Sequence, residues 1–307
     1  MITVFTPTYN RSYLINELFN SLMSQTYKNF EWLIVDDGST DDTEQVINKL
    51  IEKAEFNIRY FKKENEGKHI AINYGAKRAS GEWFFIVDSD DKLVKDSLLL
   101  VSKYCLQIEE NHKYAGVVGL RGNSTEVPIL SWHNEKTNKK KSKLLLKEFI
   151  DADAIEYFFH MNIHGDHAEV VRTEVLRKHP FPKYGKERYL TEGYLWYTLA
   201  DEGYIFRWFN QVIYITEYLE DGLTHNGRKI AMENPIGRKN FDNLLVKIKR
   251  VPLVKKIYFC ADYFRFGYHS KENILHLWKE CNNKWVAFIS LPLSIAVIFI
   301  KDRKIGV

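Results

Sequence analysis

The chain has 307 residues, of which 45% are hydrophobic and 27% charged, an ordinary balance for a globular protein with a substantial core. The formal net charge is only +4, so the overall charge does not indicate nucleic acid as a partner. The three cysteines (Cys105, Cys260 and Cys281) are far apart, which excludes a disulfide framework and a zinc-ligand spacing. They favour reduced thiols in the cytoplasm, and the apolar stretch after Met1 lacks the pattern of a secretory signal.

The first part of the chain alternates between apolar strands and amphipathic helices. Strands are predicted over residues 2–5, 30–35, 57–61 and 83–87, with helices over 14–22, 46–51 and 70–79 between them. Ser12 or Asn10 is expected to cap the first helix, and Gly81 to end the third. A helix over 93–108 and a strand over 114–120 follow. This order predicts an α/β fold with a doubly wound, mostly parallel central sheet and flanking helices.

Two of the predicted strands run directly into acidic residues: Asp36 and Asp37 after the second, and Asp88, Asp90 and Asp91 after the fourth. Ligands of open α/β sheets bind just beyond the carboxyl ends of the strands. Carboxylates this close repel one another, and a hard cation such as Mg²⁺ or Mn²⁺ relieves that repulsion while it binds substrate phosphates. An acidic turn is the alternative for either cluster alone. Two clusters at one edge of one sheet favour a site for a nucleotide and a divalent cation.

The middle of the chain gives weaker signals. The Lys-rich segment 135–147 is either a solvated loop or a flap near an anionic ligand. Residues 163–172 contain two histidines and two acids, in a spacing that matches no zinc signature. Glu192 stands at the start of a predicted helix, where an acid also compensates the helix dipole. Aromatic strands are expected over 204–215, followed by a polar, turn-like stretch over 217–225.

The C-terminal part is basic and rich in aromatic residues. Residues 285–300 are almost wholly apolar, broken by Pro292 and followed by Lys301, Arg303 and Lys304. This stretch is shorter than the roughly 20 residues that span a bilayer, and it is typical of a helix lying in the membrane interface. A buried core helix and a subunit interface in a homo-oligomer are the alternatives. We therefore predict a catalytic domain over 1–234 and a helical, membrane-associating tail over 235–307.

Six segments resemble the family 2 inverting glycosyltransferases of GT-A fold, of the type that builds bacterial cell-surface and capsular polysaccharides. In chain order they are FTPTYNR at 5–11, WLIVDDGSTD at 32–41, NEGK at 65–68, NYG at 73–75, ASGE at 79–82 and VDSDD at 87–91. The resemblance is strong over about residues 1–125 and weaker as far as about 225. It implies a nucleotide-sugar-binding half over 1–125 and an acceptor-side half over 126–234.

The resemblance also implies roles for single residues. The donor, most often a UDP-sugar, would be bound by Thr6, Pro7, Thr8, Asp36, Asp37, Lys68, Asn73, Asp88 and Ser89. Within this set Asp36 would meet the uracil and Asp88 the ribose, while Asp90 would hold Mn²⁺ or Mg²⁺ at the diphosphate. The general base would be Glu192, although Gly193 replaces the second acid of the family's usual pair. Asp166 and His164 are the acceptor-side candidates.

The function that we expect is transfer of a hexosyl or hexosaminyl group, with inversion, to a glycan or polyprenyl-linked acceptor. The expected place is the inner face of the cell membrane, with the tail on the membrane surface. A nucleotidyltransferase is the first alternative, but it would usually need a Gly-rich phosphate loop where Thr6–Asn10 stand. A non-catalytic nucleotide-sugar-binding module is the second, and the presence of both Asp90 and Glu192 disfavours it.

Overall fold

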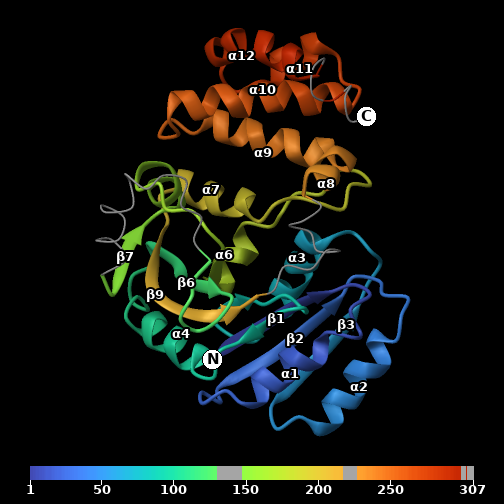
Figure 1. Cartoon of the computed structure of the whole chain (residues 1–307), viewed down its shortest axis with the longest axis vertical. Coiled ribbons are helices and arrows are strands. Elements are labelled where there is room, and N and C mark those ends of the chain that lie inside the picture. Colours follow the sequence, from blue (N-terminus) through green and yellow to red (C-terminus); the bar gives the residue numbers. More distant parts are fainter. Residues whose placement is uncertain (130–146, 217–226, 299–301, 303–307) are drawn as a thin grey trace. The chain divides into compact units, whose positions relative to one another are not determined.

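A computed structural model describes residues 1–129, 147–216, 227–298 and 302 of the chain (Figure 1). The Lys-rich segment and the polar stretch over 217–225 lie almost wholly outside the described residues. The chain divides into two compact units. The sheet unit comprises Met1–Phe181 and Glu202–Tyr218, and the helical unit comprises Pro182–Asp201 and Leu219–Val307. The predicted domains divide at residue 234 instead, and the functions assigned to them stay predictions.

The sheet unit is built on a nine-stranded sheet in the order β3-β2-β1-β4-β8-β6-β9-β5, with β7 paired to β9. The strands are β1 Ile2–Thr8, β2 Phe30–Asp36, β3 Asn57–Lys62, β4 Trp83–Ile86, β5 Lys92–Leu93, β6 Tyr114–Gly122, β7 Phe149–Ala152, β8 His167–Arg172 and β9 Ile205–Ile215. The first four pair in parallel, β8 is antiparallel to both β4 and β6, and β6 is parallel to β9. The predicted α/β fold with a mostly parallel sheet is confirmed.

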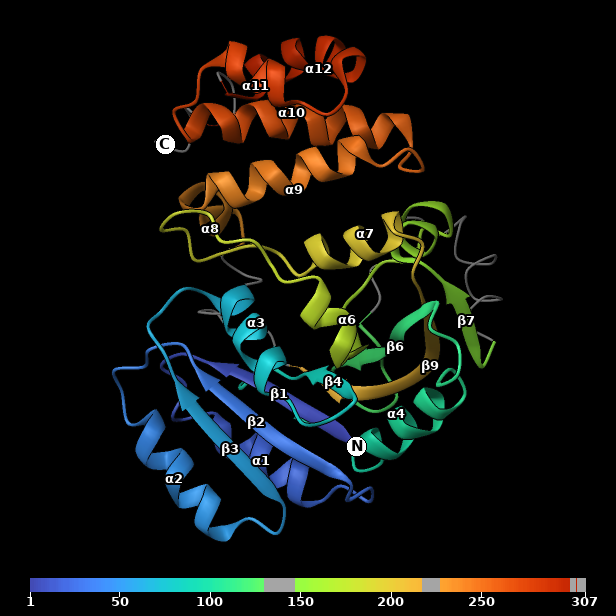
Figure 2. The same cartoon turned by 180° about the vertical axis from the view of Figure 1, so that it is seen from behind.

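The helices of the sheet unit lie between its strands in the sequence, and the first three connect parallel strands. They are α1 Ile15–Met23, α2 Thr43–Lys53, α3 Lys68–Arg78, α4 Ser97–Leu106 and α6 Thr173–Lys178, with a π-helical turn at Glu156–His160. The chain steps from β1 through β2 to β3, then returns through α3 to β4 on the other side of β1. Right-handed crossovers in opposite directions require helices on opposite faces, and Figures 1 and 2 show α3 across the sheet from α1 and α2. The order of the strands therefore reverses between β1 and β4.

Three local expectations were wrong. Neither Ser12 nor Asn10 caps α1, because its N-cap residue is Leu14. The helix expected from residue 93 begins at Ser97, since Lys92–Leu93 pair with β9 as a short strand. Gly81 does not end α3, which stops at Arg78. A Cβ at Gly81 would lie 2.5 Å from the backbone nitrogen of Thr3, so glycine is needed there for close approach of two backbones.

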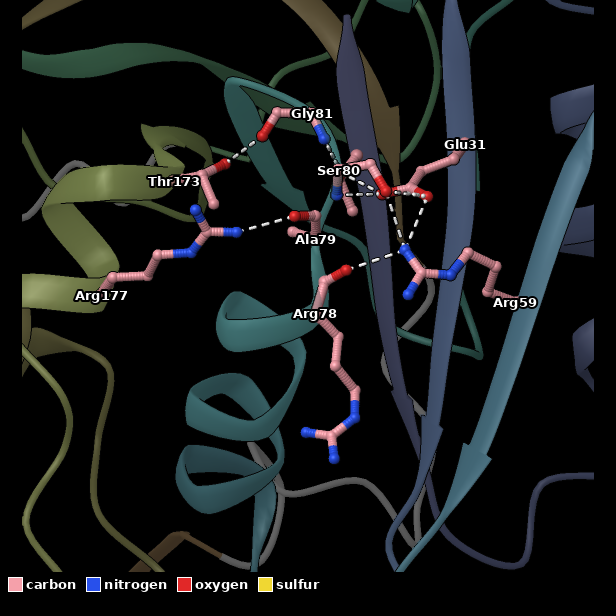
Figure 3. Close-up of polar contacts among 9 residues, drawn as sticks. Glu31, Arg59, Arg78, Ala79, Ser80, Gly81, Thr173 and Arg177 are labelled. Carbon is pink, nitrogen blue, oxygen red and sulfur yellow. Dashed lines mark hydrogen bonds and ion pairs between the residues drawn. The ribbon is translucent and has the colours of Figure 1, made fainter.

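The connection between α3 and β4 is held by a buried carboxylate at the start of β2 (Figure 3). Glu31 is 2% exposed and accepts hydrogen bonds from Thr3 Oγ1 at 2.7 Å and from the backbone N–H of Ser80 at 2.6 Å. Arg59 donates to Glu31 at 3.1 Å and to the carbonyl of Arg78 at 2.8 Å. From the other side, Arg177 donates to the carbonyl of Ala79 at 2.7 Å. Both ends of the α3–β4 segment are therefore fixed by this network.

Replacing Glu31 with glutamine is expected to lower the free energy of unfolding by about 3 kcal/mol, because donors aimed at a buried carboxylate lose a charged acceptor. Burial raises the pKa of Glu31, but the hydrogen bonds from Ser80, Thr3 and Arg59 outweigh it and lower that pKa overall. A lowered pKa stabilises the fold above the ordinary value of 4.5, so the difference between wild type and variant should shrink on acidification below it. Denaturant titration at pH 7 and pH 4 measures both effects.

The control for this prediction is Glu44→Gln. Glu44 also pairs with a cation, Lys62, but the two side chains are 50% and 40% exposed. An exposed pair is worth about 0–1 kcal/mol. A loss for Glu31→Gln no larger than for Glu44→Gln would show that the network does not stabilise the fold.

The helical unit contains α7 Gly193–Asp201, α8 Gly227–Glu233, α9 Pro235–Lys247, α10 Leu253–His269, α11 Ile274–Glu280 and α12 Lys284–Val297. Helix α10 packs against α9, α11 and α12. Their shared core is apolar and includes Val246, Phe264, Leu277 and Val286. The predicted helical C-terminal region is confirmed. Among the described residues, every helix is too short or too polar to cross a bilayer.

Candidate functional site

The candidate donor site lies at the carboxyl ends of β1, β2 and β4, where the strand order reverses. The carbonyl of Phe5 in β1 accepts the N–H of Val87 at 2.8 Å, the last bond between β1 and the β4 segment. Pro7, the next residue of β1 whose backbone faces that segment, has no N–H. The two strand ends therefore separate beyond Phe5. A switch point of this kind is where open α/β sheets bind ligands.

The two acids after β2 organise the loops around them. Asp36 is fully buried, and its two carboxylate oxygens accept hydrogen bonds from the N–H of Ser39 at 2.6 Å and from the Tyr60 hydroxyl at 2.7 Å. Asp37 accepts from Lys63 at 2.7 Å and from the N–H of Gly67 at 2.7 Å. Asp36 thus fixes the loop after β2, and Asp37 fixes the segment that leads into α3. The direct contact between Asp36 and uracil stays a prediction.

Gly67 gives this segment its shape. Its φ of 93° lies in the left-handed region, which favours glycine, and it is the residue before the first turn of α3. The turn places Lys68 at the N-terminus of the helix, where its amine lies 2.5 Å from Asp88 Oδ1. Lys68 is also the first residue of α3, at the end where the helix dipole is positive.

Beyond β4, Asp88 and Asp91 are held by two residues from distant strands. Arg121 of β6 places its Nη1 atom 3.6 Å from Asp88 and 3.7 Å from Asp91, with its guanidinium carbon 4.1 Å from the ring centre of Tyr214. The Tyr214 hydroxyl of β9 accepts the N–H of Asp88 at 2.8 Å and donates to Asp91 Oδ2 at 2.7 Å. The turn after β4 is therefore fixed at both acids.

The three acids of this turn have different electrostatic environments. Burial raises the pKa of Asp88, but the charges of Lys68 and Arg121 outweigh it, so that pKa is lowered overall. Burial and the negative charge of Asp88 raise the pKa of Asp90. The same two causes raise the pKa of Asp91 to about 7. Asp88 is already neutralised by protein cations, whereas Asp90 and Asp91 carry an electrostatic cost when ionised.

The remaining donor-side candidates of the sheet unit lie in this region, several of them with structural partners. Thr6 is buried and its Oγ1 accepts the indole N–H of Trp32 at 2.9 Å. Asn73 exchanges two hydrogen bonds of 2.8 Å with the backbone of Phe181. Ser89 is buried. Thr8 Oγ1 is buried without a hydrogen-bond partner among the described residues, which leaves one polar atom at the end of β1 unsatisfied.

The acceptor-side candidates stand on the loop that enters β8. His164 forms a hydrogen bond of 2.7 Å with the Asn162 side chain. The Asp166 carbonyl accepts the backbone N–H of Arg121 at 3.3 Å, and Arg121 Nε donates to the His167 carbonyl at 2.6 Å. Arg121 therefore joins this loop to the acids after β4. The roles of His164 and Asp166 toward an acceptor stay predictions.

Glu192 belongs to the helical unit and directly precedes α7. Its carbonyl accepts the N–H of Leu195 at 3.0 Å, which begins the helix as the sequence predicts. A Cβ at Gly193 would lie 3.5 Å from the Phe241 ring, an ordinary contact distance. Local packing therefore does not exclude the second acid of the usual pair at this position. The role of Glu192 as base is likewise a prediction.

Comparison with known proteins identifies the family. The model of glycosyl transferase family 2 matches residues 3–171, more than half of the chain. The chain belongs to glycosyltransferase family 2. An uncharacterized glycosyltransferase of Rickettsia felis is 43% identical over 111 residues, 36% of this chain and only 18% of that protein. A GalNAc(5)-diNAcBac-PP-undecaprenol beta-1,3-glucosyltransferase of Campylobacter jejuni is 27% identical over 97% of this chain and 92% of its own length.

Solved structures show the same fold as this family 2 glycosyltransferase. Staphylococcus aureus TarS 1–349 in complex with UDP-GlcNAc has a TM-score of 0.54 at 18% identity, covering 97% of this chain and 81% of that one. The Pyrobaculum calidifontis mannosyltransferase PcManGT, in complex with GDP-Man and Mn²⁺, has a TM-score of 0.53 at 19% identity, covering 99% and 82%. The GT-A resemblance inferred from sequence motifs is thereby confirmed for the fold.

The acids after β4 fit a divalent cation shared with a substrate. Within the described residues, no three His, Cys, Asp or Glu side chains converge as a complete metal centre. Mg²⁺ and similar ions bound to a diphosphate need only one or two protein carboxylates. Asp90 is partly exposed, and a cation would remove the cost that raises its pKa. Asp91 Oδ1 is buried with no hydrogen-bond partner among the described residues. This oxygen of the turn is therefore still able to accept a hydrogen bond or to bind a cation.

Sequence reasoning missed three residues that hold the acids of the candidate site in this family 2 glycosyltransferase: Arg121, Tyr214 and Tyr60. Each contacts an acid of the site but lies on a strand other than the one that acid follows. Tyr214 and Asp88 are 126 residues apart in sequence. No local motif marks such residues. The one available signal is that an arginine and a tyrosine lie within or beside predicted apolar strands, where each needs a partner.

Proposed function

We propose that this chain transfers a sugar from a UDP-sugar to a glycan or lipid-linked acceptor, with inversion, in the synthesis of a surface polysaccharide. The observation that carries the proposal is the turn after β4. Its acids lie at the switch point of the sheet beside Lys68 and Arg121. The names of the Campylobacter and Staphylococcus relatives support an undecaprenol-linked or polymeric acceptor and a UDP-linked donor.

The charges of the site suit a nucleoside diphosphate. The N-terminus of α3 and the amine of Lys68 present positive charge to one side of the turn after β4. Asp88 holds that amine in place, and on donor binding we expect Lys68 to turn from Asp88 toward the diphosphate. The freed Asp88 carboxylate would then accept hydrogen bonds from the ribose hydroxyls, as the family resemblance implies. Thr8 Oγ1, which is unsatisfied, would gain a donor-side partner.

Asp90 would hold Mn²⁺ or Mg²⁺. When bound, the ion supplies positive charge that offsets the charge developing on the departing diphosphate. Asp91 keeps the turn in place through Tyr214, and Arg121 keeps Asp88 and Asp91 from repelling each other. The protein thus contributes a turn that is held by Tyr214 and Arg121, with the Asp90 carboxylate left to bind the ion.

Inversion follows from a single displacement at the anomeric carbon. The acceptor hydroxyl attacks one face of the sugar while the diphosphate departs from the other. Glu192 would take the proton of the attacking hydroxyl as the new glycosidic bond forms. The pair of electrons of the broken bond leaves with the diphosphate. One base for the acceptor and one cation for the diphosphate are the full set of groups that this mechanism needs.

Release of nucleoside diphosphate from a panel of donors tests the proposal. UDP-Glc, UDP-GlcNAc, UDP-GalNAc and GDP-Man would be incubated with the full chain, with Mn²⁺ or with EDTA, and with a polyprenyl-linked glycan as acceptor. We expect turnover of one UDP-sugar that requires the metal, and NMR of the product should show an inverted anomeric centre. Calorimetry that detects no binding of any UDP-sugar in the presence of Mn²⁺ would overturn the proposal.

A further inference from the structure

The last helix of the helical unit exposes most of its large apolar side chains. Helix α12 packs Val286 and Ala287 into the apolar core and also buries Ser290 and Ser294, at 0% and 1% exposure. Its large apolar side chains point outward instead, and Trp285 and Phe288 are 83% and 70% exposed. The hydroxyl of Ser290 donates to the carbonyl of Val286 at 2.7 Å, whereas that of Ser294 has no partner among the described residues. Large apolar side chains that are exposed together on one helix mark an interaction site.

The exposed side chains continue along the helix as a single stripe. Ile289, Leu293 and Ile295 are 54%, 36% and 44% exposed. Helix α11 adds Leu275, which is 70% exposed. Both helices pack on α10, and both views show them on the side of α10 opposite α9 (Figures 1 and 2). We call the exposed residues Leu275, Trp285, Phe288, Ile289, Leu293 and Ile295 the outer face.

The charges in the sequence of α12 and of the residues after it indicate what covers the outer face. From residue 281 to the end, the sequence has four basic residues (Lys284, Lys301, Arg303 and Lys304) and one acid, Asp302. Asp302 is 2% exposed and paired with Arg265 at 2.6 Å, so its charge is neutralised internally. Helix α11 ends with an exposed lysine and an exposed acid, Lys279 and Glu280, whose charges cancel, so the excess of positive charge comes from α12 and the sequence after it. A tryptophan at the polar end of an apolar helix with excess positive charge suits the interface of an anionic bilayer.

We propose that the outer face is a monotopic membrane-binding surface, whose apolar side chains enter the headgroup boundary of a bilayer that contains anionic lipid. A second copy of the chain fits less well. The sequence from residue 281 onward has an excess of basic residues, and its one acid, Asp302, is already paired with Arg265, so a second copy would offer this segment no free acid of its own to pair with. An anionic lipid surface matches both the exposed apolar side chains and the excess of basic residues. Binding to it needs no rearrangement of the protein, because the apolar side chains already point outward.

This surface goes beyond the proposed function and does not depend on it. The residues of the outer face belong to the helical unit, whereas the donor-side residues belong to the sheet unit. Membrane binding would bring the enzyme to lipid-linked acceptors, but it adds no group to the reaction. Release of UDP from a soluble donor with a water-soluble acceptor analogue should therefore be the same for wild type and for variants of the outer face. Failure of one proposal leaves the other testable.

Vesicle flotation of the full chain tests the surface. We expect wild type to float with vesicles that contain 30% phosphatidylglycerol, more than with phosphatidylcholine alone, and less in high salt because the electrostatic attraction is screened. The double variant Trp285→Ser, Phe288→Ser should reduce the vesicle partition constant at least about tenfold. Both side chains are exposed, so the fold should be retained. Leu106→Ser, at a leucine that is 65% exposed on α4, is the matched control and should float like wild type.

Three results would overturn the proposal. The first is wild type that stays soluble with both kinds of vesicle, and the second is a double variant that floats as well as wild type. The third is sedimentation showing a dimer that the double variant converts to a monomer without any change in flotation, which would assign the outer face to a second copy.

Discussion

Replacing Asp90 with asparagine is expected to lower metal-dependent sugar transfer by about 10²–10³-fold, because a bound cation offsets several kcal/mol of charge developing on the leaving diphosphate. Asparagine keeps the size of the side chain but loses the negative charge that would hold the ion. Burial and the charge of Asp88 already raise the pKa of Asp90, so the substitution removes an electrostatic cost. The fold should therefore be at least as stable, and the loss should lie in the reaction.

Initial rates with a Mn²⁺ titration measure this effect. Wild type should be inactivated by EDTA, whereas Asp90→Asn should show a low rate that EDTA no longer changes. The control is Asp96→Asn, the same substitution at an exposed aspartate whose Oδ1 atom accepts a hydroxyl hydrogen bond from Thr26 at 2.7 Å. Asp96→Asn should keep the wild-type rate and metal response. A normal Mn²⁺-dependent rate for Asp90→Asn would assign the metal to another residue.

The parallel half of the sheet could be predicted because its signals are local. The runs over 32–35 and 83–87 are apolar throughout, as expected for strands buried on both faces. Parallel strands linked by helices have their carboxyl ends at one edge, so the acids after them had to converge. This reasoning found Asp37 and Asp88 and their common edge without knowledge of any side-chain position.

The antiparallel part could not be predicted in the same way. Strand β8 separates β4 from β6, but its sequence, HAEVVR, includes a histidine and an acid, and its pattern did not predict a strand. His167 is buried, and its Nε2 lies 3.2 Å from the Tyr157 hydroxyl. Burial lowers the pKa of His167 to about 4, so it stays neutral. Which strand lies beside β4 depends on long-range packing, and so does the position of Arg121 over the acids.

Helix α12 illustrates a further limit. Its sequence is apolar on nearly all sides, so periodicity cannot tell which face packs on the protein. The structure turns the serines inward and Trp285 outward. Composition alone therefore predicted a membrane-associating segment. Which of its residues would touch a membrane could be identified only from the packing of α12 on α10.

Replacing Glu192 with glutamine is expected to leave donor binding unchanged and to lower sugar transfer by about 10²–10⁴-fold, the usual contribution of a general base. Glutamine has the same size and can still accept a hydrogen bond, but it cannot take the proton of the acceptor hydroxyl. The start of α7 rests on the backbone carbonyl of Glu192, which the substitution retains. The change should therefore lower kcat without altering the dissociation constant of the UDP-sugar, as measured by calorimetry beside initial rates.

Glu202→Gln is the matched control, because Glu202 follows α7 closely in sequence, is 50% exposed and pairs with His179 at 2.8 Å. It should transfer sugar at the wild-type rate. Since a Cβ at Gly193 meets only ordinary contacts, Glu192→Gln combined with Gly193→Asp offers a second test. If an acid at position 193 restores transfer, proton removal is the missing step; transfer at the wild-type rate by Glu192→Gln alone would place the base elsewhere, with Asp166 the next residue to replace.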